Sequence, residues 1–359
     1  MSKVHWTGHP FVDAGLSALA AVARVQQLGH LMAKHLDEAV KQLKRILLSD
    51  QALGLGVKKA FARTAMSYLF PNSELVNPMH WRSDKTPLQN ANNVRQKFSK
   101  ALEEDLKRAK RCLQSDGGDA ICYACGERRP AEAMVTMRKD KMPLLEGIVN
   151  FYPALAFGVQ ICGLCALAVR FLPLSVMRTG TKNRMWFLHA QSLPITATIA
   201  RTYGWEHFNR LIAKDEPLDF FSSWETAGDA GMVLYLLCEL LERYGDVLIE
   251  TYQNPLPTTA YLFSNSNRGG FIQPLPIPNE LLLFLAKLQL QSQRAFRRFW
   301  RELLQIPASL SKGEREARIK FVQLTANCLL NVQSIIAKCL DHNTPKLRGG
   351  WRGHRLYLK

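Results

Sequence analysis

Four of the eight cysteines form two pairs, each with two residues between its thiols: Cys122 with Cys125, and Cys162 with Cys165. This spacing lets both sulfurs of a pair bind one metal ion, and two pairs complete a tetrahedral four-sulfur site. Gly126 follows the first pair and Gly163 lies inside the second, where a tight turn needs a small residue. The spacing therefore predicts a Zn2+ site. Because all four positions are filled, the site is expected to be structural rather than catalytic.

The 36 residues between the two pairs exceed the spacing of compact zinc ribbons, and an inserted pair of strands with its turn would accommodate them. A redox-active Cys-x-x-Cys motif is one alternative, but no thioredoxin-like βαβ setting surrounds either pair. Another alternative is that four cysteines of the hydrophobic core have this spacing by chance. The remaining cysteines fall within helical patterns and are expected to be core thiols: Cys112, Cys238, Cys328 and Cys339.

A second group of residues has the charge and the spacing to bind phosphate groups. Four arginines recur at intervals of three and four and so share one face of a helix: Arg294, Arg297, Arg298 and Arg301. Four guanidinium groups on one stripe repel one another unless a polyanion runs across them, and in the sequence only Glu302 interrupts them. The pattern favours phosphate contact over an ordinary solvated helix face.

Two weaker basic segments accompany this stripe. The segment 345–359 is rich in Arg and Gly and contains Trp351, a composition that suits phosphates or a stacked base. The residues expected to contact nucleic acid in these segments are Lys346, Arg348 and Arg352, and, in a smaller basic spot, Lys182 and Arg184.

Uncharged amides gather at 89–93, within a stretch (71–93) that the sequence presents as a polar loop. Amide side chains can bond to base edges in a DNA groove, so Asn90, Asn92 and Asn93 are candidates for reading a short DNA motif. Asn-rich loops are more often simple turns, and that alternative stays open.

The sequence carries none of the catalytic signatures sought: a phosphate-binding Gly-rich loop, a Gly-x-Ser-x-Gly elbow, or a His-Glu-x-x-His pair. The acidic run Glu103-Glu104-Asp105 lies among lysines and arginines, which favours a solvated helix face with ion pairs over a two-metal site. We therefore expect that this protein is not an enzyme.

The charge of the whole chain points to the same class of partner. The 359 residues hold 47 Lys and Arg against 30 Asp and Glu, a formal net charge of +17. Residues 1–120 hold 18 basic and 11 acidic groups, residues 121–279 hold 14 of each, and the last 80 residues hold 15 and 5. A neutral middle between two basic ends predicts contact with an extended polyanion at both ends. An apolar fraction of 47% excludes a disordered basic tail.

Helical periodicity dominates the elements that must position these residues. It covers about 14–48, 57–70, 92–114, 191–202, 205–213 and 229–251, and two amphipathic helices follow over 280–304 and 314–340. Short runs at 133–137 and 183–189 predict strands, and 259–263 with 271–273 predict a hairpin. The expected fold is α+β and mostly helical, with a zinc-stapled N-terminal α/β region followed by a C-terminal helical bundle.

Two domains are expected: 1–275, with the zinc element at about 120–170, and a basic helical domain over 276–359. No apolar run is long enough to span a bilayer, and the first residues lack the apolar region of a signal peptide. A cytoplasmic location without a membrane partner is predicted, and disulfides are rare in that compartment.

Three segments together resemble a known family. The opening Trp-Thr-Gly-His-Pro-Phe-Val-Asp-Ala-Gly at 6–15 is similar to the start of the large subunit of type I CRISPR surveillance complexes (Cascade) of the A/B type. The Cys-x-x-Cys pairs match a zinc element found in many of those proteins. The stretch from Tyr261-Leu262-Phe263-Ser264-Asn265 to Leu281 resembles the segment before their helical C-terminus.

The resemblance implies a subunit that caps the crRNA 5′ end of the complex. Its N-terminal domain would read the protospacer-adjacent motif and start strand separation, and its helical C-terminal part would line the displaced strand. The implied partners are crRNA, target double-stranded DNA, the backbone, crRNA-processing and small subunits, and a recruited helicase-nuclease or transposition proteins.

Two other functions stay open: a stand-alone zinc-containing RNA- or DNA-binding protein, and a metal-dependent nuclease whose acidic ligands are not evident in the sequence. Some relatives make a separate small subunit by internal translation of the C-terminal region. Met232 is the last methionine, and a product starting there would have 128 residues.

Overall fold

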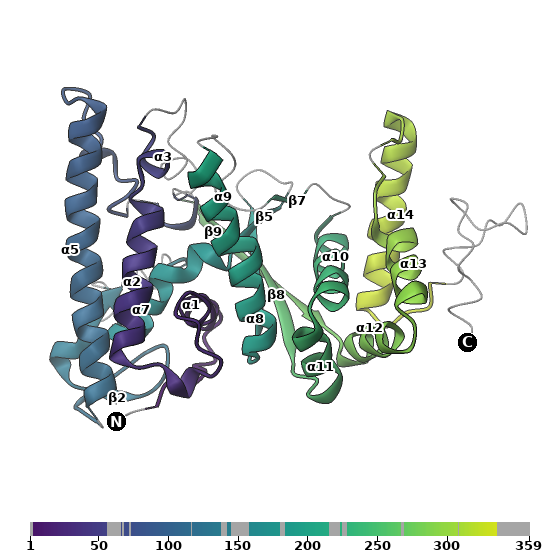
Figure 1. Cartoon of the computed structure of the whole chain (residues 1–359), viewed down its shortest axis with the longest axis horizontal. Coiled ribbons are helices and arrows are strands. Elements are labelled where there is room, and N and C mark those ends of the chain that lie inside the picture. The colour runs from purple at the N-terminus through teal and green to yellow at the C-terminus, as the bar shows by residue number, and fades with distance from the viewer. Residues whose placement is uncertain are drawn as a thin grey trace, which may run out of the picture.

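The computed structural model of the chain describes residues 3–55, 66, 68–71, 73–115, 117–137, 142–144, 158–179, 184–214, 223–224, 228–266, 269–307 and 309–335. Figure 1 shows helices at both ends of an elongated molecule, with the strands of a sheet running between them. The α+β class with a helical C-terminal region is confirmed.

The N-terminal half is built on α1 (Pro10–Val22), α2 (Ala33–Leu47), the short α3 (Asp50–Leu53) and the long α5 (Pro87–Gln114). The helix expected over 14–48 is broken in two, and Arg24 adopts a positive φ of 56° just after α1. Most of the helix expected over 57–70 lies outside the described residues.

The loop expected over 71–93 is wrong at its end, because α5 already begins at Pro87. The Thr86 hydroxyl caps this helix by accepting a hydrogen bond from the backbone N–H of Gln89. The side-chain oxygen of Gln89 in turn accepts a hydrogen bond from the backbone N–H of Thr86. A capping box followed by proline at the first helical position is a strong local start signal.

Two small antiparallel strand pairs carry three of the four paired cysteines, Cys122, Cys125 and Cys162. The first joins β1 (Ala120–Ile121) to β2 (Arg128–Arg129), and the second joins β3 (Met134–Met137) to β4 (Val159–Cys162). Helix α7 (Gly163–Phe171) follows β4 directly. The strand pair expected between the two cysteine pairs is therefore present.

A five-stranded sheet with the order β7-β5-β6-β8-β9 crosses the middle of the molecule. Its strands are β5 (Met177–Thr179), β6 (Met185–Ala190), β7 (Ser223–Trp224), β8 (Thr258–Ser266) and β9 (Gly269–Ile277). All neighbours pair antiparallel except β5 with β7. The expected hairpin is thus longer than its sequence signal, because β9 continues through Pro274 and Pro276. These prolines stand at alternate positions, where a missing N–H costs no bond to β8 and leaves the open edge poor in donors.

The remaining α-helices and a π-helical turn all come after β6 in the sequence, either between the later strands or after the last one. They are α8 (Leu193–Ile199), a π-helical turn (Ala200–Trp205), α9 (Glu206–Lys214), α10 (Gly228–Arg243), α11 (Gly245–Gln253), α12 (Asn279–Gln291), α13 (Gln293–Leu304) and α14 (Lys312–Leu330). The helix expected over 280–304 is divided at Ser292, whose side chain caps α13 by accepting from the Ala295 amide. Within the described residues, none of the helices has the length and apolar character that a membrane crossing needs.

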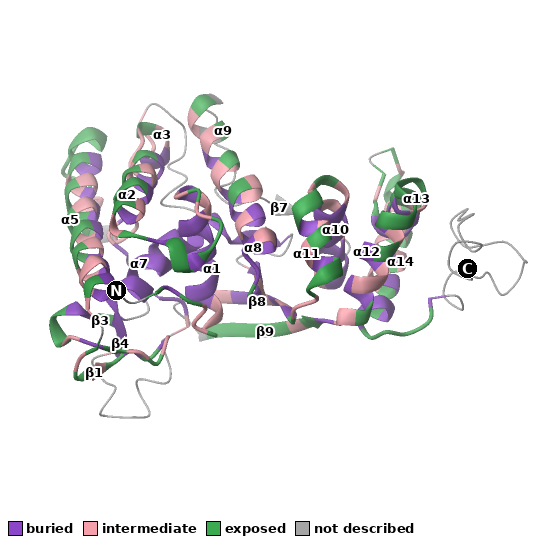
Figure 2. Ribbon diagram, turned by 60° about the horizontal axis from the view of Figure 1, so that its bottom comes forward, coloured by how far each residue is buried: buried purple, intermediate pink, exposed green. Residues whose placement is uncertain are grey.

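The sheet separates two hydrophobic cores. Phe187 of β6 and Phe263 of β8 belong to the N-terminal core, whereas their chain neighbours Trp186 and Leu262 belong to the C-terminal core. Successive side chains of a strand point to opposite faces, so β6 and β8 each contribute to both cores. Figure 2 shows buried residues on both sides of β8, while β9 is largely exposed.

The C-terminal core contains more of the chain than the expected domain 276–359. It also takes α10, α11 and one face of the sheet, so it includes Val233 and Leu262 as well as residues of α12 to α14. The domain division at 275 stays a prediction. In the structure, that position lies inside β9.

Close helix packing beneath the cysteine hairpins depends on Gly15. A Cβ atom at this position would lie 2.1 Å from the Ala168 carbonyl oxygen, so α1 and α7 approach each other with no room for a side chain. Gly163 plays the same part between α7 and α5, where a Cβ would lie 2.4 Å from the Cβ of Arg108. These contacts fix the helix that carries Cys165.

Candidate functional site

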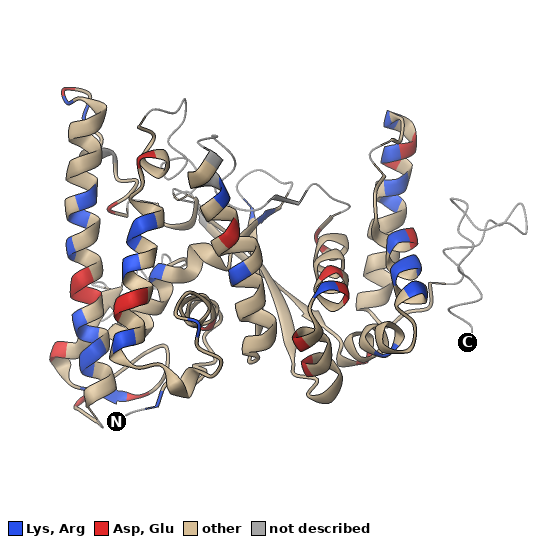
Figure 3. Ribbon diagram, viewed as in Figure 1, with Lys and Arg blue, Asp and Glu red and all other residues tan. Residues whose placement is uncertain are grey.

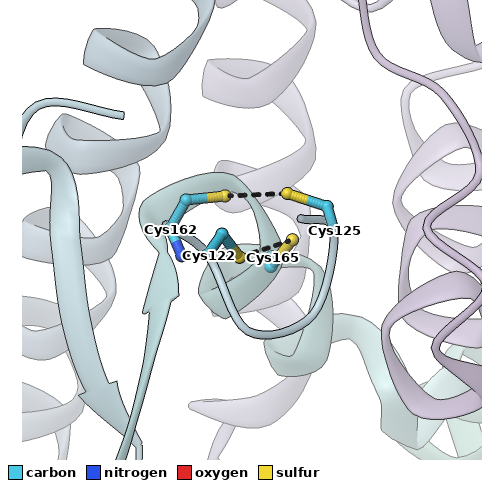
Figure 4. A group of neighbouring side chains, drawn as sticks. All are labelled: Cys122, Cys125, Cys162 and Cys165. Carbon is cyan, nitrogen blue, oxygen red and sulfur yellow. Dashed lines mark hydrogen bonds between the residues drawn. The ribbon is translucent and has the colours of Figure 1, made fainter. Parts of the chain in front are cut away.

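The four cysteines of the two pairs come together in one cluster. Their sulfur atoms all lie within 4.8 Å of one another, and three of the four residues are buried. The Cys122 and Cys165 sulfurs are 3.9 Å apart, and those of Cys125 and Cys162 are 4.0 Å apart. Figure 4 shows the four side chains converging from the hairpin turn and the start of α7. The expected grouping of these residues is confirmed.

The separations suit a metal ion better than disulfides. Four sulfurs bound at about 2.3 Å to one tetrahedral ion lie about 3.8 Å from one another, whereas disulfide sulfurs lie about 2.05 Å apart. These two separations match the edges of that tetrahedron. The donor set and its geometry are therefore compatible with a four-sulfur metal site.

Backbone hydrogen bonds shape the first pair into a turn. The Cys122 amide donates to the Glu127 carbonyl at 2.9 Å, and the Gly126 amide donates to the Cys122 carbonyl at 2.9 Å. Gly126 has a φ of 71°, a conformation that favours glycine. The Tyr123 amide bonds to the Gln160 carbonyl of β4, which ties the turn to the second hairpin.

The second pair sits where β4 becomes α7. Cys162 is the last residue of the strand, and Cys165 lies in the first turn of the helix, whose amides and dipole favour negative charge. The Cys162 amide donates to the Cys122 sulfur at 3.1 Å. Hydrogen bonds from the thiols of Cys125, Cys162 and Cys165 also lower the pKa of Cys122. A divalent cation at the centre would replace the thiol protons.

The N-terminal segment lies against this cluster. Lys3 and Thr7 line a cavity of about 10 Å³ together with Cys125 and Cys165, and His5 lies 3.5 Å from the Glu127 carboxylate. The N-terminal residues of the described chain thus lie over the cysteine cluster.

Asp13 organises the opening motif from inside the protein. Its carboxylate accepts from the Thr7 amide and hydroxyl, both at 2.8 Å, and from the Gly8 amide at 3.0 Å. The His189 ring on β6 lies 3.0 Å from the same carboxylate, which has no solvent exposure. Burial lowers the pKa of the neighbouring His9 despite the charge of Asp13. No pattern in the sequence indicates the Asp13–His189 contact, because 176 positions separate the two residues.

The third segment of the resemblance also meets the first. The Phe11 ring lies 5.1 Å from the Phe263 ring and 5.1 Å from the Phe187 ring. Asn265 is buried, donates to the Leu69 carbonyl and accepts from the Leu144 amide. The segments at 6–15 and 261–265 therefore meet in the N-terminal core.

The arginine stripe is exposed on α13, as expected, but it is less free than its sequence indicates. Arg297 donates to the Glu242 carboxylate of α10 at 2.5 Å, and Arg301 lies 3.8 Å from the same carboxylate. Arg298 pairs with Glu302 at 2.9 Å. Within the described residues, only Arg294 of the four has no ion pair. The structure thus adds a second acidic partner, Glu242, to the one visible in the sequence.

The asparagine candidates lie on the first turns of α5 rather than in a loop. Asn90 is 7% exposed. Its side-chain amide accepts a hydrogen bond from the backbone N–H of Arg82 and donates one to the Arg82 carbonyl. Asn92 is exposed and accepts from Arg95, and Asn93 is half-buried. Asn90 serves the fold of the preceding turn, which leaves Asn92 and Asn93 as the accessible amides.

The smaller basic segments fall largely outside the described residues, which include neither Lys182 nor Lys346, Arg348 and Arg352. Arg184 is described. It pairs with Asp229 at 2.9 Å and stacks over the Phe271 ring at 4.8 Å, so it joins α10 to the edge strand β9.

The acidic run on α5 divides in a way that its sequence does not show. Glu103 is exposed, as expected, but Asp105 is 4% exposed and pairs with the buried Arg170 of α7 at 2.9 Å. Burial lowers the pKa of Arg170, but the carboxylates of Glu74 and Asp105 more than reverse this shift. The solvated face expected for all three acids is therefore wrong for Asp105. Of the four cysteines expected as core thiols, Cys112, Cys238 and Cys328 are buried, and Cys339 lies outside the described residues.

Comparison of the chain with protein-family models, with curated proteins and with solved structures found no match in any of the three.

Proposed function

We propose that this chain is the non-catalytic large subunit of a type I CRISPR RNA-guided DNA-targeting complex. In this role it recognises the protospacer-adjacent motif, helps to open the duplex and stabilises the displaced strand. The complex acts in antiviral defence or in RNA-guided transposition.

The observation that carries the proposal is that the three segments of the resemblance form one structural unit. Asp13 fixes the opening motif, Phe11 packs on Phe263, and the N-terminal residues cover the cysteine cluster. Segments that begin more than 100 positions apart thus depend on one another, as expected if they were retained together as the core of a family fold.

For the metal we propose a structural Zn2+ held by Cys122, Cys125, Cys162 and Cys165. Four thiolates in a tetrahedron are a donor set that zinc prefers, and they leave no open position for a substrate. Bound there, the ion would supply the cross-link that joins the first hairpin to the start of α7.

The test is to purify the tagged full-length chain from its own cells and to sequence the bound RNA. We expect a guide RNA and repeated backbone subunits in the same particle. A chain that purifies without RNA or partners would favour the stand-alone nucleic-acid-binding protein instead. Magnesium-dependent cleavage of DNA by the isolated chain would favour the nuclease.

Mass spectrometry of the same particle tests the internally translated small subunit. Met232 is buried in α10, and a product from Met232 would keep most of α10 and all elements from α11 to α14. It would lack β6, so one flank of β8 would lose its partner strand. Detection of only the full-length chain would contradict this part of the proposal.

A further inference from the structure

Helices α2 and α5 lie side by side at one end of the molecule and are joined by a ladder of ion pairs (Figure 1). Asp37 pairs with Lys110 at 2.6 Å, and Lys44 pairs with Glu103 at 2.6 Å. The partners are seven positions apart on each helix and run in opposite directions. A third pair joins Arg95 to Asp50, just beyond the end of α2. The ladder therefore uses the acidic groups at the seam between the helices.

A second set of cations flanks this ladder. Lys34 and Lys41 on α2, and Lys100 and Lys107 on α5, are again seven positions apart on each helix, and all four are exposed. Lys41 lies between the two ion-paired residues of α2, and Lys107 lies between those of α5. The two lysines are therefore at the same level along the helices. Within the described part of the chain, none of these four lysines has an ion pair, and Figure 3 shows basic residues along both helices.

These four lysines and Arg111 make up what we call the α2–α5 strip. Arg111 is half-buried and reaches the Glu132 carbonyl at 3.5 Å. The exposed Glu38 on α2 and Glu104 on α5 offset two of the five charges. A surface hollow of about 400 Å³ lies over the α5 side and is lined by Glu103, Leu106, Lys107, Lys110, Arg111 and Gln114.

Like charges facing one another across a helix seam are unfavourable unless an anion lies between them. At 1.5 Å per residue, the strip spans about 20 Å, which is the rise of on the order of six phosphates on one strand of a duplex. On α13, by contrast, three of the four arginines already have carboxylate partners.

The strip also lacks the side chains that bind unpaired bases. Among the described residues of α2 and α5, only Leu88 is a large apolar side chain that is exposed to solvent. It lies at the end of α5 that is far from Lys107 and Arg111. Proteins that bind single strands offer aromatic rings for stacking, whereas contact with duplex backbone requires only cations and hydrogen-bond donors.

We propose that the α2–α5 strip binds the phosphate backbone of a nucleic-acid duplex without regard to its sequence. This inference takes only the class of partner from the proposed function and adds a surface that the sequence did not single out. Each lysine in contact replaces a counterion of the duplex, so binding by the strip must weaken as salt rises.

The test measures binding of the full-length chain to duplex DNA and to duplex RNA of unrelated sequence over a series of salt concentrations. The variant replaces Lys34, Lys41, Lys100 and Lys107 by Gln. The control replaces four exposed cations elsewhere on the described surface by Gln and so removes the same charge: Lys3, Lys85, Arg201 and Lys287.

We expect the strip variant to lower the slope of log affinity against log salt by roughly 0.9 for each lost contact, and the control to change it by less than one contact. A loss on DNA alone or on RNA alone supports the strip and identifies the duplex that it binds. Equal slopes for variant and control on both duplexes would overturn the proposal. Should the fourfold variant fold poorly, Lys41→Gln with Lys107→Gln gives the same comparison with two charges.

The co-purification experiment separates this inference from the proposed function. A reduced slope in a chain that binds no guide RNA would leave the strip standing and remove the CRISPR role. An unchanged slope in a chain that does carry guide RNA would remove the strip alone.

Discussion

Asp13 shows how one residue can account for a conspicuous motif. A buried carboxylate is costly unless its oxygens are bonded, and here two amides, a hydroxyl and a histidine ring surround it. Gly15 follows two positions later and lets α1 touch α7. The motif at 6–15 is thus explained by bonding and packing within the chain.

The cysteine cluster gives the sharpest prediction at the scale of single residues. We expect Cys122→Ser to lower bound zinc from one equivalent per chain to none, because three sulfurs hold the ion poorly and the hairpin turn depends on it. The measurement is metal content by mass spectrometry, together with the thermal unfolding midpoint, which should fall.

The matched control is Cys328→Ser, a buried cysteine on α14 outside the cluster. Its zinc content should stay at one equivalent even if its stability falls. Full zinc content in the Cys122 variant would contradict the metal assignment.

At the scale of elements, α5 shows what local signals can and cannot give. Thr86, Pro87 and Gln89 are a readable start signal, and it places the amides of Asn90 and Asn92 on a helix. The partners of that helix are not readable, because Asp105 meets Arg170 across 65 positions. A helix boundary depends on neighbours in sequence, whereas the buried face depends on neighbours in space.

The crossing of α1 and α7 predicts the effect of a single methyl group. We expect Gly15→Ala to destabilise the protein by about 1–3 kcal/mol, because the new Cβ would lie 2.1 Å from the Ala168 carbonyl oxygen and the helices must separate. Urea denaturation measures the change.

Gly313→Ala on α14 is the control, since a Cβ there meets nothing within 4 Å. Alanine has the higher helix propensity, so this variant should be as stable as the parent or more so. Equal behaviour of the two variants would show that α1 and α7 do not pack as closely as described.

The ion pairs on α13 predict that its arginines differ in their contribution to DNA binding. Replacing Arg294 by Gln should lower the salt slope by roughly 0.9 on a duplex or roughly 0.7 on a single strand. Arg297→Gln should lower the slope less, because Glu242 already pairs with this guanidinium. Salt-dependent binding assays on the full chain measure both, and equal losses would mean that Glu242 gives way to phosphate.

At the scale of the whole molecule, the sheet joins the two cores because the same strands pack against both. Leu262 and Phe263 are neighbours on β8, both are fully buried, and each belongs to a different core. Loss of either core would expose one face of the same strands, so neither core is expected to unfold alone.

Calorimetry of two neighbouring variants tests this coupling. We expect Leu262→Ala and Phe263→Ala each to cost about 3 kcal/mol and to shift a single unfolding transition as a whole. Two resolved transitions, with each variant moving only one of them, would show instead that the cores are independent domains. That result would revive a division of the chain near 275.

The sequence by itself determined the α+β class, the helices with strong periodicity, and the grouping of Cys122, Cys125, Cys162 and Cys165. These features follow from spacing within short windows, where backbone geometry alone fixes which side chains are neighbours. Only the tertiary structure decided that Glu242 neutralises part of the α13 stripe, that Asp105 is buried, and that the ion pairs between α2 and α5 bring Lys41 to the level of Lys107. Those outcomes depend on which distant elements pack together, because an ion pair forms only where packing brings two opposite charges together.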